Sequence, residues 1–168
     1  MRIGIDISQI VHEGTGVGAY VRNIVRELVR IDKKNEYVLF GASLRKLSHF
    51  TAYFEEVRAV NPRARLVTAP IPPTILEFVW NRLHVIPVEW LIGHVDVFWS
   101  SDWAQPPLMR AKGVTTIHDV SFLRYPETFA KTIIDVQRRR LARVKRVCRA
   151  ILCDSEATKR DVIELVGI

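Results

Sequence analysis

The sequence predicts an α/β fold, a Rossmann-like three-layer sandwich with a mainly parallel sheet. Short apolar runs alternate along the chain with longer stretches in which apolar residues recur at helical spacing. The runs are apolar almost throughout, as expected of strands that helices cover on both faces of a sheet. With 168 residues, 48% of them hydrophobic and 26% charged, the chain has the size and composition of one domain, 1–168, with a hydrophobic core.

The expected strands are short apolar runs bounded by polar, glycine or proline residues. The first run, "RIGIDIS", begins at the second residue, and the third, "ARLVTAP", ends at prolines, which break a strand. In chain order the expected strands are 2–8, 36–41, 64–70, 95–101, 113–119 and 149–155.

Helical patterns occupy most of the segments between the strands, which are expected at 17–31, 74–93, about 129–147 and 156–168. In the first of them Val17, Val21 and Val25 share one face and arginines occupy the other. Pro87 should break or kink the second, and Asp154 or Ser155 should cap the last.

Ligands of open parallel sheets bind beyond the carboxyl ends of the strands. Functional residues are therefore expected in the segments that directly follow each strand. These segments are 8–18, 41–46, 70–74, 100–107, 118–128 and 154–158.

The glycine-rich segment "GTGVGA", residues 14–19, satisfies the dinucleotide pattern G-x-G-x-x-A. Its context argues against a dinucleotide, because "QIVHE" separates it from the first strand and no carboxylate ends the second strand, "LFGAS". Glycines still allow close approach of the backbone, and the following helix directs free N–H groups at an anion. A phosphorylated ligand and a mobile turn both remain consistent with the segment.

Several segments together resemble the N-terminal domain of glycosyltransferase family 4. They are "GVGAYVRNIVREL" after the first strand, "VDVFWSSDWAQPPL", "TTIHDVSFLRYPETF" and "ILCDSEATKRDVIELVGI", in this order and spacing. "HDVSFLRYPETF" is most similar to members that transfer mannose or related sugars in polysaccharide synthesis. These retaining enzymes have the two-domain GT-B fold, so the resemblance implies that the chain is the N-terminal half of that fold.

In GT-B enzymes the N-terminal domain mainly takes the acceptor and the C-terminal domain mainly holds the nucleotide sugar. The resemblance therefore implies acceptor binding for hexosyl transfer in polysaccharide or glycolipid synthesis, with mannosyl transfer as the example that the motif favours. The family's C-terminal domain is expected to be absent from 1–168, so the chain alone should transfer no sugar and should need that domain in cis or in trans.

The resemblance also implies site residues. The backbone amides of Gly14, Gly16, Val17 and Gly18 should lie near the donor diphosphate. His118 should hydrogen-bond a sugar hydroxyl and contact the developing oxocarbenium-like charge. Asp119 should orient that imidazole or bind acceptor, unless it only caps the following turn.

Candidate acceptor residues follow the fourth and fifth strands. Trp103 and Asp102 suit stacking and hydrogen bonding of a sugar, whereas Trp99, within the strand, is expected in the core. Arg124 and Tyr125 lie in the loop after the fifth strand, and Arg124 is either a contact to an anionic acceptor or a solvated arginine.

The chain carries 25 Lys and Arg against 18 Asp and Glu, a formal charge of +7. Much of the excess lies in 138–149, "RRRLARVKRVCR", where Leu141 and Val144 should face inward and most arginines outward. This face is either solvated or in peripheral contact with anionic lipid near a lipid-linked acceptor. Nucleic acid is not expected, because no aromatic residues interleave with the charge.

No acidic pair or His/Cys cluster has metal-ligand spacing, so the expected donor, such as GDP-mannose or a UDP-sugar, should react without a metal or other cofactor. Neither a signal peptide nor a run of ~18–20 apolar residues is present, which favours the cytoplasm, at the inner face of the membrane if lipid is contacted. Two other classes remain: a non-catalytic binding module that docks on a separate donor domain, and a dinucleotide-binding Rossmann protein.

Overall fold

The computed structural model describes residues 1–168 and contains one six-stranded sheet in which every pair of neighbouring strands is parallel. The strand order is β3-β2-β1-β4-β5-β6, so the chain builds one half of the sheet outward from β1 and the other half outward from β4. The strands are β1 (Arg2–Asp6), β2 (Glu36–Ala42), β3 (Arg65–Ala69), β4 (Val97–Ser100), β5 (Lys112–Ile117) and β6 (Cys148–Cys153).

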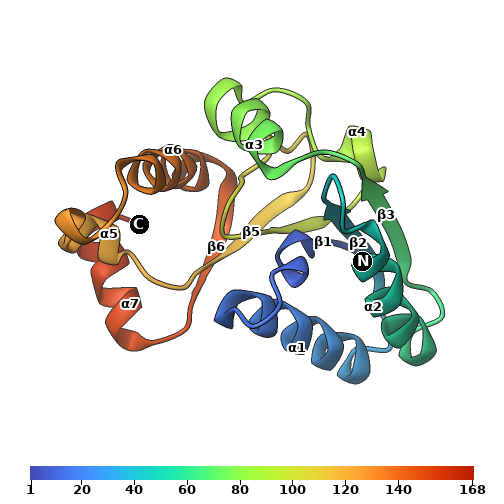
Figure 1. Ribbon diagram of the computed structural model, residues 1–168. Coiled ribbons are helices and arrows are strands. Elements are labelled where there is room, and N and C mark those ends of the chain that lie inside the picture. The colour runs from blue at the N-terminus through green and yellow to red at the C-terminus, as the bar shows by residue number, and fades with distance from the viewer.

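Helices cover both faces of the sheet, as Figure 1 shows: α1 and α2 lie on one side, and α3, α4 and α6 lie on the other. The longer helices are α1 (Gly16–Ile31), α2 (Leu47–Val60) and α6 (Lys131–Val147). The shorter α-helices are α3 (Pro73–Leu76), α4 (Glu89–Ile92), α5 (Ser121–Arg124) and α7 (Glu156–Asp161). Two single helical turns are η1 (Ser8–Val11) and η3 (Pro126–Thr128), and two segments with wider turns are η2 (Glu77–Leu83) and η4 (Val162–Val166). The three-layer α/β fold expected from the sequence is confirmed.

Side chains of β2 alternate between the two helical layers, which explains why the strand is apolar throughout. Tyr37 and Leu39 pack in the core under α1 and α2, whereas Val38 and Phe40 pack in the core under α3 and α4. All four are at most 1% exposed. A strand buried on both faces leaves no position for a polar side chain until it ends.

Two helical segments differ from their sequence-based expectations. The stretch 74–93 is broken, but the break begins before Pro87: η2 has wide turns, and His84 and Ile86 have positive φ angles of 57° and 61°. A helix at Leu47–Val60, which was not predicted, carries Phe50, Tyr53 and Val57 into the core at helical spacing. Polar and apolar residues are mixed along this segment, so the helical spacing of its buried residues is not evident from the sequence.

Candidate functional site

The carboxyl edge of the sheet brings together polar residues from four strands. β1 ends at Asp6, β4 continues into Ser101 and Asp102, β5 leads to His118, and β6 leads to Asp154. Because β1 and β4 are neighbours from which the chain winds in opposite directions, a crevice is expected between them. Three cavities open along this edge, and most of the predicted site residues line one of them.

His118 is held in a defined orientation by neighbours from two other elements. Its Nδ1 atom lies 2.6 Å from Asp154 Oδ2, and its ring meets the Tyr20 ring edge to face, with centroids 4.9 Å apart. Its backbone carbonyl accepts a 3.0 Å hydrogen bond from the Thr158 hydroxyl. With Nδ1–H donating to the carboxylate, the neutral imidazole presents Nε2 as an acceptor.

Asp154, and not Asp119, orients the His118 imidazole. Asp119 Oδ1 instead accepts a 2.8 Å hydrogen bond from the amide of Ser121 and so caps the turn into α5. Asp154 comes to lie beside His118 because the strands before them are paired: Ile117 at the end of β5 is the register partner of Cys153 at the end of β6. Ser155, not Asp154, caps α7 by accepting from the amide of Thr158 at 3.0 Å.

A cavity of about 170 Å³ joins His118 and Asp119 to Asp102. Val17, from the first turn of α1, and Arg140, from α6, also line it. His118 and Asp119, which follow β5, therefore share a single cavity with Asp102, which follows β4 and was expected to bind acceptor.

The glycine segment forms a second cavity of about 500 Å³ at the start of α1, and its glycines have different roles. Gly14 has a φ angle of +79°, which only glycine adopts without strain. A Cβ on Gly18 would lie 2.8 Å from the carbonyl oxygen of His12, so Gly18 permits close packing of α1 on the preceding turn. Gly16 has open space around it.

Thr15 caps α1 and leaves two amides free for a ligand. Its side chain accepts from the amide of Gly18 at 3.1 Å, and its carbonyl accepts from Ala19. The amides of Gly16 and Val17 donate to no protein acceptor. Free amides at the first turn of a 16-residue helix favour an anion.

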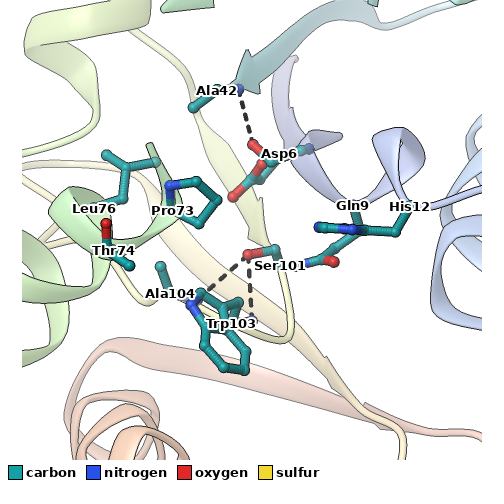
Figure 2. A pocket seen from close by; sticks show the side chains of 11 residues that line it. Asp6, Gln9, His12, Ala42, Pro73, Thr74, Leu76, Ser101, Trp103 and Ala104 are labelled. Atoms are coloured by element: carbon teal, nitrogen blue, oxygen red, sulfur yellow. Dashed lines mark hydrogen bonds between the residues drawn. The ribbon is translucent and has the colours of Figure 1, made fainter. Parts of the chain in front are cut away.

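A third cavity, of about 320 Å³, lies beyond the carboxyl ends of β1, β2 and β4, beside α3, and is drawn in Figure 2. Trp103 lines it, opposite His12 from the turn after β1. The Ser101 hydroxyl accepts from the amides of Trp103 and Ala104 at 3.4 Å each, which fixes the loop. Trp99 is 7% exposed, in the core as expected.

Asp6 lies at the base of this cavity and was not singled out from the sequence. It is 3% exposed, and Ser8 donates its amide to the carboxylate at 2.9 Å. Burial raises the pKa of Asp6, against the lowering effect of hydrogen bonds from Ser8 and Ser101. The available signal was a carboxylate within the otherwise apolar run "IGIDI".

Arg124 and Tyr125 lie away from these cavities. Arg124 Nη2 is 2.6 Å from Asp161 and 3.1 Å from Glu164, so it ties α5 to the last helical turns. It is therefore an exposed arginine that two carboxylates already engage, rather than one left free for an anionic acceptor. Tyr125 is 55% exposed and lines none of the cavities at the carboxyl edge.

In the basic stretch 138–149, fewer arginine side chains face solvent than expected. Arg140 is 1% exposed, Arg139 pairs with Glu77 at 2.8 Å, and Arg143 donates to the carbonyls of Asn81 and Arg82. These contacts attach α6 to η2. The exposed basic residues of the stretch are Arg138, Lys145, Arg146 and Arg149.

No group of three or more His, Cys, Asp or Glu side chains is placed to hold a metal ion, and no helix has the length and hydropathy to cross a membrane. Comparison of the chain with protein-family models, with curated proteins and with solved structures found no match.

Proposed function

We propose that the chain is the acceptor-side domain of a retaining glycosyltransferase that uses a nucleotide sugar, in line with its sequence resemblance to glycosyltransferase family 4. The observation that carries the proposal is the cavity lined by His118, Asp119 and Asp102 beside the first turn of α1. Oriented hydrogen-bonding side chains at this place suit a polyhydroxylated ligand, and the adjacent amides suit a phosphate.

In this function the first turn of α1 would hold the donor diphosphate. The amides of Gly16 and Val17 donate to no protein acceptor, and the space at Gly16 lets an anion approach the backbone. A GDP- or UDP-sugar bound there would place its sugar toward Val17 and His118, which line the same cavity. A donor domain, in cis or in trans, would hold the nucleotide.

His118 would act on the sugar through Nε2, because Asp154 occupies Nδ1. Nε2 of the neutral ring accepts a hydrogen bond from a sugar hydroxyl, and its lone pair stabilises positive charge that develops near the anomeric carbon. The Tyr20 ring and the Asp154 carboxylate hold the imidazole in place throughout. Preorganisation of this kind costs no reorganisation during the reaction.

The acceptor would occupy the 320 Å³ cavity beyond the ends of β1, β2 and β4, where Trp103 offers an aromatic surface and Asp6, Gln9 and His12 offer hydrogen bonds. For a lipid-linked acceptor, Phe78 and Leu83 are exposed apolar residues of η2, the segment that packs against α6, and Ile86 and Trp90 are exposed on the chain that follows it. They would meet a membrane surface together with the exposed arginines of 138–149.

The test is titration of the ¹⁵N-labelled chain with GDP-mannose, a UDP-sugar and NAD, followed by NMR. We expect a nucleotide sugar to shift the amides of Gly16 and Val17 and the His118 imidazole, and NAD to shift none of them. His118→Ala should lose the sugar-dependent shifts, whereas His94→Ala, an exposed histidine at the opposite end of the sheet, should retain them. Binding of NAD alone would identify a dinucleotide-binding protein instead.

Transfer itself is tested by adding the donor domain, fused to the chain or as a second polypeptide. Release of nucleotide and glycosylation of an acceptor should need both parts and His118. Stable association with a donor domain without any transfer would favour the non-catalytic module.

A further inference from the structure

Two of the segments that line the 320 Å³ cavity are α3 and the loop after β4, which carries Trp103 (Figure 2). No backbone hydrogen bond joins these two segments. Helix α3 continues directly into η2, and the side chain of Asn81 extends from η2. Asn81 is 1% exposed and does not itself line the cavity.

Both groups of the Asn81 side-chain amide form hydrogen bonds with the backbone of the loop. Its Nδ2 atom donates to the carbonyl of Trp103 at 2.9 Å, and its Oδ1 atom accepts from the amide of Gln105 at 2.9 Å. A residue in a parallel sheet contacts its neighbouring strand in the same way, through a carbonyl and an amide two residues apart. Asn81 therefore pairs with the loop as a neighbouring strand would.

The loop depends on side chains for its position. Along 102–106 its backbone forms no hydrogen bond with another backbone group. Ser101, within the loop, accepts from two amides at the long distance of 3.4 Å, and Gln137 of α6 donates to one carbonyl at 3.0 Å. The carbonyl of Trp103 itself is held by Asn81 alone.

Helix α6 holds the turn that carries Asn81. Arg143 donates from Nε to the carbonyl of Asn81 at 3.0 Å and from Nη2 to the carbonyl of Arg82 at 2.9 Å. Both carbonyls lie near the end of η2, which is followed by His84 with a φ angle of 57°. Carbonyls at a helix end lack partners within the helix, so the arginine stabilises this turn.

We propose that Asn81 is a positioning residue for Trp103, which holds the loop against α3 and so determines the width of the 320 Å³ cavity. A buried side-chain amide is costly unless it is hydrogen-bonded, and both of its bonds here go to the loop. The inference rests on the proposed function only for the ligand, a sugar acceptor. It adds that the affinity for the acceptor depends on a residue that does not touch it.

The first experiment examines the loop without a ligand. Asn81→Leu preserves the shape of the side chain but removes both hydrogen bonds, so the amide of Gln105 should exchange with solvent about tenfold faster or more. The indole resonance of Trp103 should also shift in the ¹H–¹⁵N spectrum. Asn61→Leu is the matched control and should change neither signal, because Asn61 is also buried but ends α2, in the other helical layer.

The second experiment titrates the chain with octyl α-D-mannoside, an analogue of a lipid-linked acceptor, below its micelle concentration. Asn81→Leu should weaken this binding about tenfold, because a displaced Trp103 loses contact with the sugar. Binding of GDP-mannose at the amides of Gly16 and Val17 should stay unchanged. With a donor domain added, KM for the acceptor should rise by the same factor while kcat stays constant. A general loss of stability would not separate the two ligands in this way.

Two results would overturn the inference. One is unchanged exchange of the Gln105 amide together with an unchanged Trp103 resonance in Asn81→Leu, and the other is an equal loss of affinity for both ligands.

Should Asn81→Leu fail to fold, Arg143→Met decides, because it loosens the turn that carries Asn81 from a partly exposed position. It should affect the signals of Gln105 and Trp103, and no effect would be the contrary result. Arg146→Met, at an exposed position of the same helix, should affect neither.

Failure of the proposed function would look different. The wild-type chain would then bind neither octyl α-D-mannoside nor GDP-mannose, while the signals of Gln105 and Trp103 would still test the role of Asn81.

Discussion

Asp154 Oδ2 lies 2.6 Å from Nδ1 of His118, although 36 residues separate them in the sequence. Parallel pairing of β5 and β6 brings the ends of the two strands side by side, and the first residues beyond them then meet. The pair is partly shielded, with the imidazole 17% exposed and the carboxylate 37%. Because the carboxylate places an acceptor against Nδ1, we expect the pair to favour the proton on that ring nitrogen.

The first prediction concerns that proton. The wild-type imidazole should be the Nδ1–H tautomer, and Asp154→Ala should shift the population toward Nε2–H, because the carboxylate acceptor is lost. Unfolding should become easier by no more than about 1 kcal/mol, as for other partly exposed pairs. Imidazole ¹⁵N chemical shifts measure the tautomer. The same tautomer in both proteins would show that Asp154 does not determine it.

The second prediction contrasts two glycines of the α1 segment. Gly18→Ala should lower the free energy of unfolding by roughly 1–3 kcal/mol, because the new Cβ would lie within 2.8 Å of the backbone carbonyl of His12. Gly16→Val should leave the fold intact, because nothing lies within 4 Å of the position, but should impair ligand binding at the free amides. Chemical denaturation measures the first effect and nucleotide-sugar titration the second. Equal losses of stability in both variants would contradict the conclusion that Gly18 serves packing and Gly16 serves ligand binding.

The third prediction uses the pH dependence of stability at Asp6. Because burial raises its pKa above the ordinary 3.8, the folded protein retains a proton that the unfolded chain has lost. Asp6 therefore costs no stability below about pH 4, and its cost grows as the pH rises through the folded-state pKa. The free energy of unfolding of Asp6→Asn should therefore rise relative to that of the wild type as the pH increases from about 4 to the folded-state pKa of Asp6. Urea denaturation at several pH values tests this, and a difference independent of pH would be the contrary result.

The fourth prediction concerns the loop that carries Trp103. Oε1 of Glu89 accepts hydrogen bonds from the amides of Met109, Arg110 and Ala111 at 2.9, 3.0 and 3.1 Å. Glu89→Ala should cost about 1–2 kcal/mol of stability and speed hydrogen exchange of those amides.

The pH dependence supplies a check on the same contact. Burial opposes the ionisation of Glu89, but the backbone hydrogen bonds outweigh it and lower its pKa below the usual 4.5. The contribution of Glu89 to stability is therefore present above that value and is lost as the pH falls through the folded-state pKa. Exchange rates that stay unchanged in Glu89→Ala would refute the role.

The fifth prediction separates Arg124 from ligand binding. Arg124→Ala should loosen the contact of α5 with Asp161 and Glu164, detected as faster hydrogen exchange in the last helical turns. Its affinity for nucleotide sugars and hexoses should equal that of the wild type. A loss of affinity without a change in exchange would restore Arg124 as a binding residue.

Much of the site was accessible from local sequence. The apolar runs show where each strand ends, and the polar residues that come next were predicted to lie at one edge of the sheet. His118, Asp119 and Asp102 are such residues, and they share a cavity. The short glycine segment predicted a helix start with free amides. The sequence did not show which side chain each of these residues contacts. Residues that follow different strands are far apart in the chain, so no local pattern records their contacts.

The sequence by itself determined the α/β class, since apolar runs and helical stripes are local properties of the chain. Only the tertiary structure decided that Asp154 orients His118, that Arg124 is paired, and that Arg140 is buried. Helix α6 illustrates the reason. Its basic composition resembles a solvated face, but its packing against β5 and η2 turns Arg140 inward, where it lines a cavity with Asp102. Burial of a charge depends on what packs against it, and no residue spacing along one helix records that.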